Sequence, residues 1–234
     1  MQCVRFLTVG FLTPCKKRAS AALLACVLCI VSLDRARTET EPAPPEVQDS
    51  FLTAVEAVKS DEFKRAFMLF EELAQQDDYD AQYNLALLLR AGKGEPQNFV
   101  GALEWAWLAH LGGVTRAARL SEDLMAVTTP AAQSTVLERI DERLQARLAR
   151  GDRTAVMQYV TFNRGILPQP DLKRAYIWAL LAAALGIETG FQARDEIAKL
   201  LEISDVLEAQ EVARQMFADQ ELVNLFSDSA SGSR

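Results

Sequence analysis

Cysteine is missing from most of this chain, because all four cysteines (Cys3, Cys15, Cys26 and Cys29) lie near its N-terminus. The remainder cannot build a disulfide framework, and cysteine cannot serve there as a nucleophile or a metal ligand. Histidine is nearly missing as well, with His110 the only one. Hydrolytic catalysis normally needs a base that titrates near neutrality, and transition-metal sites draw on histidine and cysteine. We therefore predict no catalytic residue, no metal site and no cofactor.

Alternating runs of β-branched and aromatic residues, which would indicate strands, are also scarce. Helix-forming residues dominate instead, and half of all residues are hydrophobic, which is enough to bury a sizeable core. The chain is therefore predicted to be all-α, with one domain and short appendages.

The segment 1–37 differs from the rest of the chain. Three basic residues, Lys16 to Arg18, precede an uncharged apolar run from 19 to 33, and a proline-rich tract follows. This order is typical of an export signal, and the apolar run is shorter than the roughly 20 residues of a comfortable membrane span. A cleaved leader, a retained membrane anchor and lipid attachment at Cys26 are the alternatives. We expect an exported protein, either periplasmic or attached to the membrane by its N-terminus.

These features divide the chain into four predicted segments: a signal peptide or anchor over 1–37, a proline-rich linker over 38–50, a helical domain over 51–222 and a disordered tail over 223–234. Beyond the leader, 19 basic and 31 acidic residues leave a formal net charge of −12. An acidic domain binds nucleic acid poorly and is repelled by anionic lipid surfaces. We therefore expect no nucleic-acid partner, and membrane contact only through the N-terminal segment.

A pattern of small and aromatic residues recurs along the chain with a regular period. The stretch FKRAFMLFEELAQQDDYDAQYNLA aligns with FVGALEWAWLAHLGGVTRAARLSE, so that Ala66 matches Ala102 and Ala81 matches Ala117. A fixed period of this size indicates a supersecondary unit that stacks on copies of itself. A further copy follows about two periods later, where Gly92, Asn98, Ala102, Trp105, Ala109 and Gly113 are matched by Gly165, Asp171, Ala175, Trp178, Ala182 and Gly186.

Each unit is predicted to consist of two helices joined by a tight corner. Ala81 and Leu85 mark the apolar face of the first helix, and Gly92 ends it because glycine readily takes the left-handed conformation. Asn98 then caps the second helix. The Gly-x-Gly at 92–94 could instead cradle a phosphate, but the later copy loses the second glycine and no strand precedes the loop. The corner is therefore structural.

The spacing Ala-x3-Leu-x6-Gly-x-Gly-x3-Asn-x3-Ala-x2-Trp-x3-Ala-x3-Gly, read from Ala81 to Gly113, resembles the Sel1-like repeat family, relatives of tetratricopeptide repeats. The likeness covers about 61–113 and 155–186, whereas 115–150 and 190–222 keep only helical signals, such as N-caps at Thr129 and Ser204. The resemblance implies a short right-handed α-α superhelix of about eight to ten helices. It also implies a non-catalytic adaptor that binds a protein or peptide partner in the groove along the first helices of the repeats.

Four side chains are candidates for contacting such a partner. Tyr83, Trp107 and Tyr176 lie off the main apolar rows of their helices, and exposed tyrosine and tryptophan are common anchors for partners. His110 is assigned to a half-exposed or interfacial position and completes the set. Trp105 and Trp178, at the repeated position, are assigned to the core.

Two charged stretches offer weaker candidates. Arginines 143, 147, 150 and 153 are predicted to form a basic patch on the outer face of a long helix, where a partner carboxylate could dock. The acids between Gln75 and Gln82 are assigned to a solvated helix start. Two readings compete with the adaptor: an envelope enzyme or accessory that acts on or binds peptidoglycan or glycan, and a structural bundle whose groove is filled by residues 115–150.

Overall fold

The computed structural model describes residues 45–219 and 224–226, and within these ranges the chain is all-α, as predicted. The predicted leader, its Cys26 and most of the predicted tail lie outside the described residues. Ten α-helices and one π-helical segment, with no strand, make up the described part: α1 (Pro45–Lys59), α2 (Phe63–Gln75), α3 (Tyr79–Ala91), α4 (Phe99–Leu111), α5 (Thr115–Met125), α6 (Pro130–Leu148), α7 (Arg153–Thr161), η1 (Phe162–Ile166), α8 (Leu172–Ala184), α9 (Glu188–Ala198) and α10 (Ile203–Ala218).

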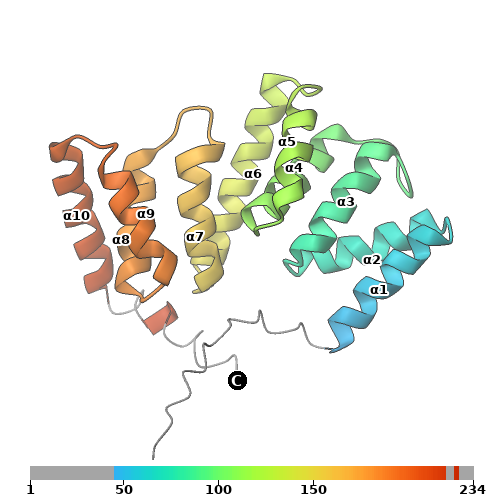
Figure 1. Ribbon diagram of the computed structural model, residues 1–234, viewed down its shortest axis with the longest axis horizontal. Coiled ribbons are helices and arrows are strands. Elements are labelled where there is room, and N and C mark those ends of the chain that lie inside the picture. Colours follow the sequence, from blue (N-terminus) through green and yellow to red (C-terminus); the bar gives the residue numbers. More distant parts are fainter. Residues whose placement is uncertain (1–44, 220–223, 227–234) are drawn as a thin grey trace, which may run out of the picture. The chain divides into compact units, whose positions relative to one another are not determined.

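The helices pack as stacked pairs (Figure 1). Most helices that follow one another along the chain are in contact, as α1 is with α2, α3 with α4, and α8 with α9. Helices two places apart also meet, α4 with α6 and α8 with α10. This is the contact pattern of an α-solenoid, in which each helix pair touches its neighbours in the chain. We call α1, α3, α5, α7 and α9 the first helices, and α2, α4, α6, α8 and α10 the second helices.

The predicted N-caps are confirmed in both repeats, and the predicted glycine C-cap is confirmed in the first. In the later repeat Gly165, the counterpart of Gly92, lies inside η1 without a left-handed φ, so it does not end α7. Gly92 ends α3 with φ of 66°. The Asn98 side chain accepts a hydrogen bond from the Gly101 N–H at 2.9 Å, and the Asp171 side chain accepts one from the Arg174 N–H at 2.9 Å. These side chains satisfy backbone donors that the first turn of a helix leaves free.

Three boundaries differ from the prediction. Helix α10 begins at Ile203 after Glu202, so Ser204 is not its N-cap. Helix α1 begins at Pro45, inside the stretch 38–50 that was assigned to a linker, because proline suits the first helical position. Phe226, inside the stretch assigned to a disordered tail, is only 1% exposed. Composition alone does not reveal that an isolated apolar residue in a polar tail has a place in the core.

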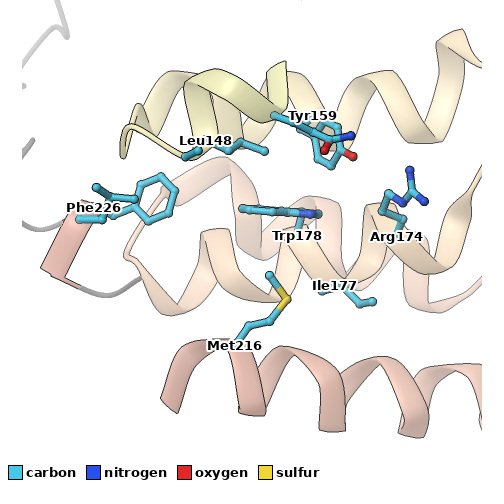
Figure 2. Close-up of a pocket in the computed structure, with 10 residues that line it drawn as sticks. Leu148, Tyr159, Arg174, Ile177, Trp178, Met216 and Phe226 are labelled. Atoms are coloured by element: carbon cyan, nitrogen blue, oxygen red, sulfur yellow. The ribbon is translucent and has the colours of Figure 1, made fainter. Parts of the chain in front are cut away.

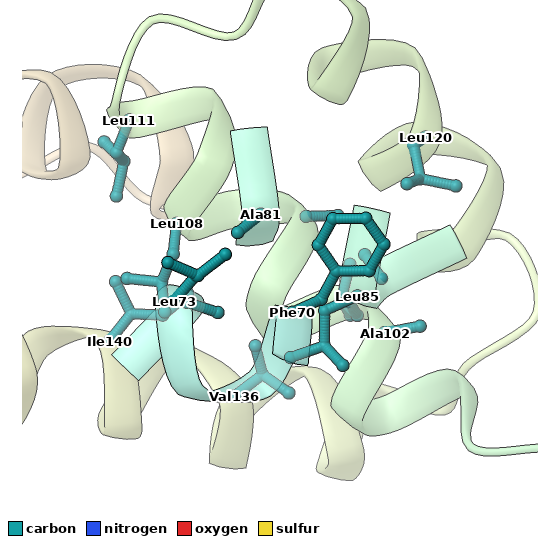
Figure 3. Close-up of a cluster of buried hydrophobic side chains, with 14 of the residues drawn as sticks. Phe70, Leu73, Ala81, Leu85, Ala102, Leu108, Leu111, Leu120, Val136 and Ile140 are labelled. Carbon is teal, nitrogen blue, oxygen red and sulfur yellow. The ribbon is translucent and has the colours of Figure 1, made fainter. Parts of the chain in front are cut away.

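The repeated alanines are buried at matching positions, and this is why the helices can approach closely. Ala66, Ala102 and Ala175 all have no exposed surface. The main core lies between α2, α3, α4 and α6, where Phe70 and Leu85 meet Val136 of the later helix (Figure 3). A smaller cluster joins α8 to α7, α9 and α10. Interiors packed to this density tolerate little change in volume.

Helix α6 is tied to the earlier repeats by a buried arginine. Arg147 is 3% exposed and lies within 3.4 Å of Asp77 and 2.7 Å of Asp152. Its guanidinium also donates to Gln158 Oε1 at 2.7 Å and to the Tyr79 hydroxyl at 3.2 Å. A buried charge is tolerated only when it is paired and hydrogen-bonded, and Arg147 meets both conditions.

This network overturns two predictions about charge. Arg147 and Arg143 do not belong to an exposed basic patch, since both pair with Asp77 inside the fold. Arg153 also makes contacts within the fold, because it donates hydrogen bonds to the carbonyl oxygens of Leu185 and Phe226. Asp77 is likewise drawn into the fold, whereas Asp78 does start a helix as predicted, since its side chain accepts a hydrogen bond from the Ala81 N–H at 2.8 Å. The sequence shows charges of both signs in each stretch, but their pairing joins positions that are far apart along the chain.

No helix among the described residues combines the length and the apolar character needed to cross a membrane. The hand of the superhelix stays a prediction.

Candidate functional site

The predicted partner-binding residues do not gather at one place. Trp107 and His110 are half-buried on α4, with an edge-to-face arrangement of rings at 5.7 Å between centroids. Burial lowers the pKa of His110 below its ordinary value. Tyr83, on α3, lies beneath the guanidinium of Arg116 of α5, 4.6 Å from the ring centroid. Arg116 also pairs with Asp80, so Tyr83 takes part in contacts between two first helices.

Tyr176 is not on the surface, and the prediction that it contacts a partner is wrong. Its side chain is 3% exposed and belongs to the smaller core cluster, where its hydroxyl accepts a hydrogen bond from Gln210 at 3.4 Å. The residue follows the repeated Ala175 and was placed outside the apolar row on that ground. Because α7, α9 and α10 all pack against α8, residues on more than one face of α8 are buried.

One cavity lies around Trp178. It has a volume of about 560 Å³ and is bounded by α6, α7, α8 and α10 and by the short segment 224–226. Figure 2 shows Trp178 at its centre, with Tyr159 on one side, Met216 on the other, and Phe226 and Arg174 at opposite ends. The residues lining it are Gln145, Leu148, Ala149, Tyr159, Arg174, Ile177, Trp178, Met216, Leu225 and Phe226.

Most of the wall is apolar, and the polar groups gather at one end. The Tyr159 ring meets Trp178 edge-on, with 5.6 Å between centroids. Burial, and next the nearby Asp141 carboxylate, raise the pKa of Tyr159. Arg174 is exposed and lies 3.3 Å from the Asp171 carboxylate, so its charge is already partly neutralised. An apolar pocket with a few polar groups at one end is the usual form of a binding site.

A second groove lies at the equivalent tryptophan, Trp105. It has a volume of about 610 Å³ between α2, α4 and the corner at 94–98, and its lining includes the carboxylates of Glu71 and Glu95. The guanidinium of Arg143, from α6, lies 5.3 Å from the centre of the Trp105 ring. The two repeated tryptophans therefore both border cavities, although they were assigned to the core.

Part of this site could be anticipated and part could not. The repeat pattern singled out Trp178, and the half-buried Ile177 is its neighbour in the chain. No sequence pattern indicates that Met216 and Phe226 belong to the site, because both come from segments that lack the repeat motif. Among the described residues there is no group of three or more histidine, cysteine or acidic side chains that could hold a metal ion. What the geometry offers is a surface for binding.

Comparison with known families agrees with this architecture. The sequence matches the Sel1 repeat at residues 56–78, 80–106 and 160–187. No curated protein matches the chain. Sel1 repeats are generally protein–protein interaction modules, and proteins of this family are typically non-catalytic scaffolds. Trp105 falls in the second matched repeat and Trp178 in the third. The chain therefore carries three Sel1 repeats on an all-α solenoid.

Proposed function

We propose that this protein is a non-catalytic adaptor of the bacterial cell envelope that binds a protein partner in the cavity around Trp178. The observation that carries the proposal is the cavity itself, about 560 Å³ with a mostly apolar wall at a repeated motif position. Protein partners commonly insert an aromatic or aliphatic side chain into such a pocket, and these anchors supply most of the binding energy.

The site differs from the groove along the first helices that the family resemblance implied. Between the first helices α3 and α5, ion pairs link Asp80 to Arg116 and Arg90 to Asp123. The cavity at Trp178 lies instead mainly between the second helices α6, α8 and α10. We place the partner there because an apolar pocket gains more from burial than a surface whose charges are already paired.

The envelope location rests on the N-terminal pattern. Basic residues followed by an uncharged apolar run and a proline-rich tract are typical of export. Confinement of all four cysteines to the N-terminal segment suits an oxidising compartment, since the domain needs no thiol chemistry there. Mass spectrometry of the protein from fractionated cells tests this, and an intact N-terminus in the cytosolic fraction would contradict it.

The adaptor function is tested by placing a charge in the cavity. Ile177→Arg puts a guanidinium beside Trp178 and should remove the partner from affinity captures. Because Ile177 is half-buried against the smaller core cluster, circular dichroism at the capture temperature checks that the variant is folded. Ile203→Arg is the matched control, because Ile203 is 78% exposed and does not line the cavity. A partner that survives Ile177→Arg, or is lost equally in both variants, would contradict the proposed site. Binding to purified peptidoglycan alone would favour the glycan-binding alternative.

A further inference from the structure

One wall of the Trp178 cavity is supplied by the chain's own C-terminal segment. Leu225 and Phe226 line the cavity, although α10 ends at Ala218. Phe226 is 1% exposed and belongs to the same core as Leu148. Figure 2 shows its ring at one end of the cavity, directed toward Trp178. A side chain from outside the helix stack thus closes one end of the cavity in which the partner is proposed to bind.

The corner between α6 and α7 is shaped to receive the backbone of this segment. Gly151 has φ of +76°, and a Cβ on it would lie 2.3 Å from the carbonyl oxygen of Leu225. Arg153 donates one hydrogen bond to the Phe226 carbonyl at 3.3 Å and another to the Leu185 carbonyl at 2.7 Å. A close backbone approach at a glycine, an arginine that donates to a main-chain carbonyl and one buried aromatic side chain thus hold residues 225 and 226 against this corner.

One side chain anchors the described part of this segment. Asn224 is exposed and Leu225 is half-buried, so Phe226 is the one deeply buried side chain among residues 224–226. A ligand tethered to its own site by a short linker has an effective concentration of about the millimolar range. A free peptide would therefore displace the segment only by binding the cavity more tightly than the segment itself does.

We propose that residues 224–226 are a latch, an internal ligand of the Trp178 cavity, and that a partner peptide bearing an aromatic residue takes the place of Phe226. The identification of this peptide as the physiological partner rests on the function proposed above. The latch itself does not, because it can be tested with the protein alone.

The test uses a fluorescent synthetic peptide with the sequence of residues 220–234. Phe226→Ala in the full chain should empty the site, so that this variant binds the peptide at least tenfold more tightly than the wild type, as measured by fluorescence anisotropy. The same peptide with alanine at position 226 should bind neither protein. A folded Phe226→Ala variant that fails to bind the peptide, or equal binding by both proteins, would overturn the proposal.

Two glycines provide a matched control for the shape of the site. Gly151→Ala, added to Phe226→Ala, should abolish peptide binding, because the new Cβ would occupy the position of the Leu225 carbonyl. Gly186→Ala introduces the same backbone strain, since Gly186 has φ of +74°, but its Cβ would meet nothing within 4 Å. The Gly186 variant should therefore keep peptide binding. Equal loss in the two variants would show that strain, and not the contact with Leu225, is responsible.

A second version of the experiment avoids any change in the core. A recognition sequence for a specific protease is inserted after Asp219, and the protein is cleaved after it has folded. The released fragment should exchange with excess labelled peptide, as measured by fluorescence anisotropy. Failure of the labelled peptide to bind the cleaved protein would overturn the latch. Either outcome leaves the Ile177→Arg test of the adaptor function unaffected, so failures of the two proposals can be told apart.

Discussion

The same repeat position carries tryptophan twice, and the two surroundings differ. Trp105 and Trp178 lie at the same distance from the cap that starts their helix, and both lie on second helices. Over Trp105 the next second helix, α6, places the guanidinium of Arg143, and Arg139 of the same helix pairs with Glu104 at 3.2 Å. Beside Trp178 the next second helix, α10, offers Met216 and leaves an apolar cavity.

This difference shows that the repeat motif specifies the helix pair, whereas the neighbouring helix determines which groups surround the tryptophan. Positions 101 and 104 hold glycine and glutamate, whereas the equivalent positions 174 and 177 hold arginine and isoleucine. Glu104 pairs with α6, and Glu71 and Glu95 make the earlier groove acidic. Ile177, in contrast, helps to make the wall of the later cavity mostly apolar. Each prediction below alters one side of this comparison.

The largest effect is expected from Arg147→Ala, which releases α6 from the repeats that it covers. Loss of the guanidinium leaves the Gln158 Oε1 without its donor and removes one of the cationic partners of Asp77 and the only one of Asp152 among the described residues. Breaking a buried ion pair costs about 3–5 kcal/mol. Urea denaturation followed by circular dichroism measures the loss. The exposed Arg139 is the control, since Arg139→Ala should cost at most about 1 kcal/mol. Equal losses in the two variants would contradict the assigned role of Arg147.

A smaller and equal effect is expected at the matched alanines. Ala102→Leu and Ala175→Leu each force a larger side chain between packed helices, at a cost of about 1–3 kcal/mol. Ala131→Leu, at an exposed site near the start of α6, should change the free energy of unfolding little. If only one of the two core variants is destabilised, the repeats do not pack equivalently.

The helix caps should contribute about equally in the two repeats. Asn98→Ala and Asp171→Ala each remove an acceptor from a free backbone N–H, at a cost of about 1 kcal/mol. Asn98→Asp and Asp171→Asn keep an acceptor at the same place and should retain most of the stability in chemical denaturation. Full loss in these conservative variants would show that the caps act otherwise than as acceptors.

The smallest effect is a pH dependence at Asp152. Burial alone would raise the pKa of this carboxyl, but hydrogen bonds from Thr154 and Arg147 outweigh burial and lower the pKa below its ordinary value of 3.8. The stabilisation is therefore complete above about pH 3.8 and is lost as the pH falls through the lower folded-state pKa. Urea midpoints at pH 6 and pH 3 should differ more for the wild type than for Asp152→Asn. Parallel midpoints would contradict this sign.

Sequence patterns predicted the structure correctly where the structure depends on residues that are close together in the chain. The glycine that ends α3 and the caps at positions 98 and 171 depend on a few neighbouring residues, and all three are found where the spacing placed them. The burial of the repeated alanines could be predicted equally well, because a repeat places them on the same helix face each time. Tyr176 and Arg147 could not be placed in this way. Their burial depends on contacts with helices that are distant in the sequence, α10 for Tyr176 and the corner before α3 for Arg147.

The sequence by itself therefore determined the helix pairs, their period and the small residues at their contacts, since each follows from backbone geometry and side-chain volume within one repeat. Only the tertiary structure decided that α6 covers the earlier tryptophan, that Arg147 is buried among acids, and that Phe226 closes the cavity at the later one. These contacts join segments without a shared motif, and their free energy comes from burial and charge pairing that no single stretch of chain contains.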